Sequence, residues 1–108
     1  MIHAAFERDG AGRLTAYRAE GHSDYAEAGY DIVCAAVSVL GATCVNSLEV
    51  LCGIEAELLA NDEGILHFRL PAIRDPEKAH DAQLLMGALL QGLTDVAEQY
   101  PDELELST

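Results

Sequence analysis

The segment from Asp31 to Cys52 is the feature of this chain that most restricts its fold. It consists almost entirely of Ala, Val, Leu and Cys, with Ser and Thr interspersed, and it is too long for an ordinary strand. A segment that is apolar nearly all round predicts a helix buried at the centre of a domain, and Gly53 supplies its C-terminal stop. One face of a sheet cannot cover such a helix, so we expect a second copy of the chain to bury the rest in a homodimer.

Alternation of apolar and polar residues predicts the strands around this helix. The predicted strands cover 2–8, 13–20, 54–58 and 66–70, and 103–106 forms a short edge strand. Glycine-containing turns at 9–12 and 61–64 join them as hairpins. Asp75 followed by Pro76 marks the start of a second, amphipathic helix that extends to Glu98. The order ββαββαβ predicts a two-layer α+β fold, with one buried central helix and one amphipathic helix packed on a mixed sheet.

The composition indicates a single domain over residues 1–108 with an aliphatic core. Half of the residues are apolar but only 6% are aromatic, so Leu, Val, Ile and Ala must fill the interior. No uninterrupted apolar run approaches the ~20 residues of a membrane span. The N-terminal sequence lacks the basic start and apolar stretch of a signal peptide. We therefore expect a cytoplasmic protein without a membrane partner.

The charge balance is strongly acidic, with 6 basic and 19 acidic side chains and a net charge of −13. This balance disfavours binding to nucleic acid or to an anionic membrane, because both require Lys and Arg. Two explanations stay open. The acidic surface either serves solubility alone, or it attracts a polypeptide rich in Lys and Arg, such as a ribosomal protein.

Three cysteines, Cys34, Cys44 and Cys52, all lie in the apolar segment. Their odd number and shared segment do not indicate a disulfide framework, so we expect reduced thiols. Cys44 and Cys52 are far from the N-terminus of the predicted helix, which favours a packing role in the core. No short-spaced pair of ligands indicates a metal site, and we expect no cofactor.

Cys34 is the candidate nucleophile. If Asp31 is the N-cap, Cys34 occupies the third helical position, where free amides and the helix dipole stabilise a thiolate. The alternative is that Cys34 is one more small buried hydrophobe. Asp31 itself either caps the helix or orients a catalytic histidine. We favour capping, because an anion aimed at Cys34 would oppose the thiolate.

His22 is the candidate general base. It stands beside Gly21 where a predicted strand ends, and a strand end next to a helix start is a rigid place from which a base can reach a thiol. The alternative is a histidine on a surface loop. Ser38 lies one turn after Cys34 on the same helical face, and it hydrogen-bonds either near the site or back to the helix. Residues 23–30 form a glycine-containing loop that is a candidate lid.

Together these residues resemble a known family. Gly-His at 21–22, followed by Gly-Tyr-Asp-Ile-Val-Cys-Ala-Ala-Val-Ser at 29–38, resembles the ribosomal-processing cysteine protease Prp family, and the length and element order fit over the whole chain. The resemblance implies a dyad with Cys34 as nucleophile and His22 as base, supported by Gly21, Asp31 and Ser38. It also implies a homodimer whose substrate is the N-terminal extension of a large-subunit ribosomal protein.

Two other functions stay open. One is a non-catalytic dimeric module that binds ribosomal proteins as an assembly factor, with Cys34 merely buried. The other is a thiol redox sensor, which requires a resolving cysteine near Cys34, and the sequence places none in the same turn.

Overall fold

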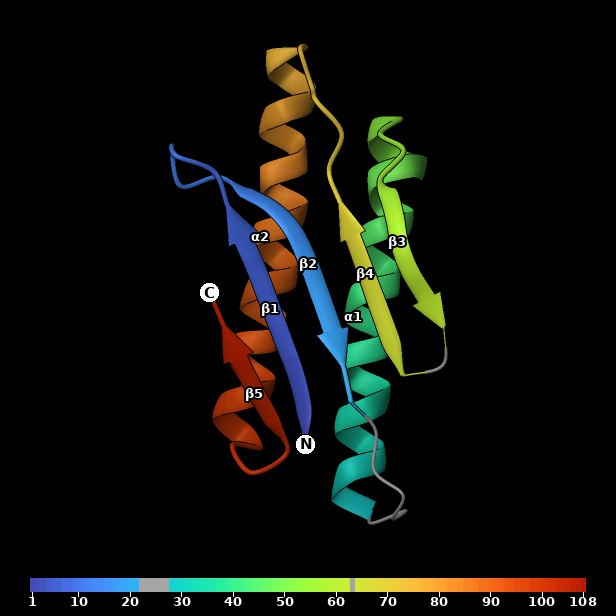
Figure 1. Cartoon of the computed structure of the whole chain (residues 1–108), viewed down its shortest axis with the longest axis vertical. Helices are drawn as coiled ribbons and strands as arrows, with labels where there is room; N and C mark the ends of the chain where they lie inside the picture. Colours follow the sequence, from blue (N-terminus) through green and yellow to red (C-terminus); the bar gives the residue numbers. More distant parts are fainter. Residues whose placement is uncertain (22–27, 63) are drawn as a thin grey trace.

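The computed structural model describes residues 1–21, 28–62 and 64–108, with the backbone alone for 28–31. Its elements follow the predicted ββαββαβ order (Figure 1). They are β1 (Ile2–Arg8), β2 (Leu14–Glu20), α1 (Ala28–Cys52), β3 (Glu57–Asp62), β4 (Ile65–Arg69), α2 (Pro76–Gln99) and β5 (Leu104–Ser107).

The strands form one mixed sheet in the order β3-β4-β2-β1-β5. All neighbours are antiparallel except β1 and β5, which run parallel with Ile2 opposite Leu104. In Figure 1 both helices lie behind the sheet, so the domain has two layers. The predicted α+β class is therefore confirmed.

The turn between β1 and β2 shows why this sequence forms a hairpin. The Asp9 carboxylate accepts hydrogen bonds from the backbone amides of Ala11 and Arg13 at 2.9 and 3.0 Å. Gly12 adopts a φ of 83°, a conformation that glycine reaches without steric cost.

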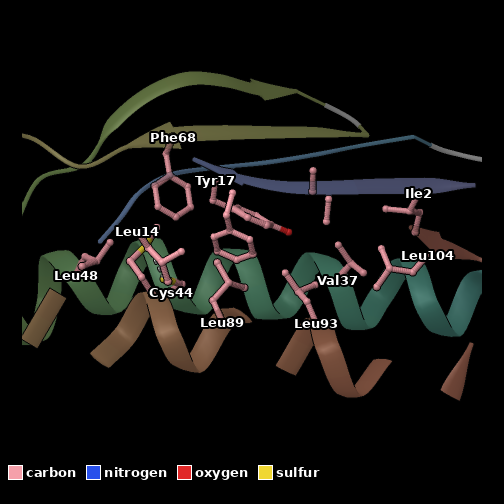
Figure 2. Packing of buried hydrophobic residues seen from close by; sticks show 14 of the residues in the cluster. Ile2, Leu14, Tyr17, Val37, Cys44, Leu48, Phe68, Leu89, Leu93 and Leu104 are labelled. Atoms are coloured by element: carbon pink, nitrogen blue, oxygen red, sulfur yellow. Dashed lines mark hydrogen bonds between the residues drawn. The ribbon is translucent and has the colours of Figure 1, made fainter. Parts of the chain in front are cut away.

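The core fills the space between the sheet and the two helices (Figure 2). Three aromatic rings form its centre, with ring centroids 5.0 Å apart for Phe6 and Tyr17 and 5.7 Å apart for Tyr17 and Phe68. The remainder is mainly aliphatic, as the composition predicts. It includes Val33, Val37, Cys44 and Leu48 from α1, with Met86, Leu89 and Leu93 from α2.

The predicted start of α2 is confirmed. Asp75 is the N-cap and its side chain accepts a hydrogen bond from the Glu77 amide, with Pro76 opening the helix. Farther along, the Gln83 carboxamide both donates to the carbonyl and accepts from the amide of Leu14, each at 2.8 Å. This pair of bonds ties α2 to the first residue of β2.

The strand predicted at 54–58 begins later, at Glu57. Gly53, with a φ of 66°, ends α1, and the amides of Gly53 and Ile54 donate to the Glu49 and Leu48 carbonyls at 3.0 and 2.9 Å. Ile54 is buried in the core as an anchor after the helix. The alternation that starts there therefore belongs to a connection rather than to a strand.

The burial of α1 is one-sided in the single chain. Val39 and Val50 are 63% and 78% exposed, and Ile32 and Leu51 are exposed beside them. The segment Ile32–Cys52 is also long and apolar enough to cross a membrane by length and composition, although Ser38, Asn46 and Glu49 interrupt its apolar residues. A helix of a soluble core passes the same criterion, and here one stripe of α1 packs in the core.

Candidate active site

A cleft of about 650 Å³ opens between α1 and the strands β2, β3 and β4. Gly21, Cys34 and Ser38 all line it, so the structure brings these sequence-predicted site residues to one place. Cys34 and Ser38 lie one turn apart on the same face of α1. Cys34 is half-buried and forms part of the wall of the cleft.

The predicted base falls in the part of the chain that is not described. His22 and most of the candidate lid at 23–30 lie outside the described residues, as does the side chain of Asp31. The pairing of His22 with Cys34 therefore stays a prediction from the sequence.

The structure corrects the expected position of Cys34 in its helix. Because α1 begins at Ala28, Asp31 lies inside the helix rather than at its N-cap, and Cys34 lies in the second turn. Only the first four amides of a helix lack intrahelical partners, and the effect of the dipole falls off within the first turn. The helix therefore includes residues 28–30, Ala-Gly-Tyr, before Asp31. The sequence interpretation missed this first turn because Asp31 has the character of an N-cap residue.

Gly21 has a conformation that no other residue type adopts easily. Its φ is 120°, and its amide donates to the Gly64 carbonyl at 3.2 Å. A β-carbon added at Gly21 would collide with the backbone oxygen of Met1 and lie 3.1 Å from Cα of Ile2. Glycine at this position fixes how the chain leaves β2, directly before residue 22.

The lining of the cleft is acidic. Glu20, Glu49, Glu55 and Asp62 line it, and none of the described lining residues is Lys or Arg. The Arg18 guanidinium forms an ion pair with the Glu20 carboxylate, with 2.6 Å between Nη2 and Oε2. Within the described part of the chain, the other three carboxylates have no ion pair, so the cleft carries a net negative charge.

Tyr17 is a cleft residue that the sequence interpretation missed. It lines the cleft and is 1% exposed, and its hydroxyl has no hydrogen-bond partner among the described residues. Burial, and then the nearby Cys44 thiol, raise the pKa of the phenol, so Tyr17 stays neutral. From the sequence, Tyr17 is expected only to lie on one face of a strand, and no local signal distinguishes it.

Cys44 fills the core, as the sequence predicts. Its thiol lies 3.6 Å from the Leu85 carbonyl oxygen, and burial raises the pKa of this thiol to about 11. All three cysteines are free thiols, also as predicted. Among the described residues, no group of three or more His, Cys, Asp or Glu side chains is placed to hold a metal ion.

Comparison with known proteins gives a consistent result over the whole chain. A family model described as cysteine protease Prp matches residues 1–105. The ribosomal processing cysteine protease Prp of Bacillus subtilis is 34% identical over 100% of this chain and 97% of its own length.

Two crystal structures of the ribosomal processing protease Prp from S. aureus share the fold. The complex with a substrate peptide has a TM-score of 0.85 and 26% identity, and covers 100% of both chains. The complex with a covalently linked product peptide has a TM-score of 0.83 and 29% identity, and covers 99% of this chain and 98% of that one.

Proposed function

Because this chain belongs to the cysteine protease Prp family, and is thus a cysteine protease, we propose that it removes the N-terminal extension of a large-subunit ribosomal protein in the cytoplasm. The observation that carries the proposal is the half-buried Cys34 on the wall of a cleft that also includes Gly21 and Ser38. The relatives' names support the ribosomal substrate, and the S. aureus enzyme binds a substrate peptide.

The proposed reaction uses a dyad of Cys34 and His22. His22 takes the proton from the thiol, and the sulfur adds to the scissile carbonyl carbon. The C–N bond then breaks, His22 returns the proton to the leaving amine, and the new N-terminus departs. Water hydrolyses the thioester, which releases the acid and restores the thiol. The covalently linked product in the S. aureus structure supports a covalent route of this kind.

The charge of the cleft supports a basic substrate. Glu49, Glu55 and Asp62 line it and form no ion pair with any residue that the structure describes, and the chain carries −13 overall. Such a field attracts a segment rich in Lys and Arg and accelerates its association. We expect kcat/KM to fall as salt concentration rises, because salt screens this attraction.

The exposed face of α1 supports a homodimer. Ile32, Val39 and Val50 present an apolar surface that the single chain leaves uncovered, and a second copy would bury it. Size-exclusion chromatography with light scattering should give the mass of two chains at micromolar concentration. Val39→Glu should dissociate them, whereas Leu84→Glu, at an exposed apolar position on α2, should not. A wild-type monomer would contradict the proposal.

The protease assignment is tested by mass spectrometry of the ribosomal protein precursor after incubation with the enzyme. We expect a defined N-terminal loss with the wild type and none with Cys34→Ala or His22→Ala. Cys52→Ala removes a half-buried thiol outside the cleft and is the matched control that should retain cleavage. Circular dichroism should show that Cys34→Ala keeps the fold.

Failure of this experiment would leave the non-catalytic assembly module as the alternative. Cleavage by Cys34→Ala would refute the proposed nucleophile. If the wild type cleaves nothing and iodoacetamide modifies Cys34 only after unfolding, Cys34 is a packing residue and the binding module is favoured.

A further inference from the structure

The Tyr17 hydroxyl is a polar group that the described chain leaves without a partner. Tyr17 is almost completely buried, yet it lines the cleft. Buried polar groups in folded proteins are nearly always hydrogen-bonded, so an orphaned one requires an explanation. Phenylalanine would fill the same space between Phe6 and Phe68 without an unpaired hydroxyl. A ligand in the cleft can supply the partner that the described residues do not provide.

The hydroxyl lies level with Gly41 of α1. A β-carbon added at Gly41 would lie 4.0 Å from the Tyr17 oxygen and 3.4 Å from its ring. Figure 2 shows this oxygen, the red atom, between the strands and α1. The same β-carbon would meet Cδ2 of Leu66 at 2.8 Å. The half-buried Leu66 side chain, which lines the cleft, therefore lies at the same level. Because the hydroxyl is buried, a ligand reaches it only when a neighbouring side chain moves.

The distance along α1 between Cys34 and the Tyr17 hydroxyl predicts which residue of a bound peptide lies beside that hydroxyl. Gly41 follows Cys34 by seven residues, which is about 10 Å along the helix at ~1.5 Å per residue. An extended peptide advances ~3.3 Å per residue. A peptide that runs along α1 therefore brings the side chain of the residue about three positions from the scissile bond to the level of Tyr17.

We propose that Tyr17 is a specificity-determining residue, whose hydroxyl hydrogen-bonds an uncharged polar side chain about three residues from the scissile bond. This inference rests on the proposed protease function. The neighbouring lining residues Val37, Ala42 and Leu66 are apolar, so a charged side chain would lose its hydration there. The acidic lining further disfavours a carboxylate. A neutral phenol both donates and accepts, which suits a hydroxyl or a carboxamide.

The test measures kcat/KM of the wild type and of Tyr17→Phe on a peptide that spans the cleavage site of the ribosomal protein precursor. A second set of peptides replaces each uncharged polar residue within four positions of the scissile bond by an apolar residue of similar size. Tyr17→Phe should lower kcat/KM roughly 10- to 100-fold on the unmodified peptide. On the peptide altered about three positions from the scissile bond, the wild type and Tyr17→Phe should have the same kcat/KM.

Thermal unfolding shows whether a lower kcat/KM of Tyr17→Phe comes from lost peptide recognition or from a less stable fold. Tyr17→Phe removes no hydrogen bond within the described chain, so its melting temperature should be no lower than that of the wild type. Thr15→Val is the matched control, because it removes a hydroxyl from the same strand outside the cleft and should leave kcat/KM unchanged.

The outcomes distinguish this inference from the proposed function. If the wild type cleaves and Tyr17→Phe cleaves every peptide equally well, only the inference is overturned. If Tyr17→Phe lowers kcat/KM by the same factor on every peptide, the inference is also overturned. A hydroxyl that recognises one peptide side chain should make no difference on the peptide that lacks this side chain. If the wild type cleaves no peptide, the proposed function fails and the inference fails with it.

Discussion

Replacement of Gly21 by alanine should destabilise this protein more than replacement of the turn glycine Gly12, because two separate effects add at Gly21. Its φ of 120° is a backbone conformation that costs an L-residue about 1–3 kcal/mol. The added β-carbon would also collide with the Met1 oxygen and press on Ile2.

The collision cannot be relieved freely, because the start of β1 is held by its neighbours. The Ile2 amide donates to the Glu103 carbonyl at 2.9 Å, and the Gly21 amide donates to Gly64 at 3.2 Å. Loss of one such bond costs ~1 kcal/mol. Backbone strain and the loss of one hydrogen bond should together make Gly21→Ala lower the free energy of unfolding by roughly 2–4 kcal/mol.

Gly12→Ala is the matched control, because Gly12 has a positive φ of 83° but nothing lies within 4 Å of its added β-carbon. It should cost only about 1 kcal/mol, since backbone strain acts there without a collision. Urea unfolding of both variants measures the difference. Equal shifts of the two midpoints would refute the contribution of the Met1 contact.

Three further predictions concern stability. Leu48→Ala, at a position that is 0% exposed, should cost about 2–5 kcal/mol in urea unfolding, whereas Leu84→Ala, at a 61% exposed position, should stay within ~0.5 kcal/mol. Asp75→Ala removes the N-cap of α2 and should cost ~1 kcal/mol; an unchanged midpoint would contradict the capping role. The Cys44 thiol titrates at about 11 in the fold, against an ordinary value of 9.0. Between these values the unfolded chain binds fewer protons at Cys44, so the contribution of Cys44 to stability should be complete below pH 9 and fall as pH rises towards 11. Cys44→Ala should flatten that slope, and an unaltered slope would contradict the assignment.

The sequence predicted those parts of the fold whose signals are local. The start of α2 follows from Asp75 and Pro76, which act within one turn. Strand alternation predicted β1 and β2 almost to the residue. Asp31 and the nearby Gly29 predicted a helix start at residue 31, but the helix begins at Ala28 and includes Gly29 despite its low helix propensity.

The candidate site was predictable only in part. The motif identified Gly21, Cys34 and Ser38, which the structure places on one cleft. Tyr17 could not be identified in this way, because only the three-dimensional structure shows whether a buried hydroxyl has a hydrogen-bond partner. Its surroundings come from Gly41 and Leu66, which are distant in sequence and meet Tyr17 only in the folded domain.

The parallel pairing of β5 with β1 joins two strands that lie far apart in the sequence. Ile2 pairs with Leu104 and Ala5 with Ser107, so no earlier part of the chain can supply these contacts. Synthesis proceeds from the N-terminus, and the outer edge of β1 therefore stays unpaired until residues 104–107 emerge. An open edge of this kind recruits other strands. Chains that lack residues 104–107 should therefore associate edge to edge, whereas chains that contain these residues close that edge themselves.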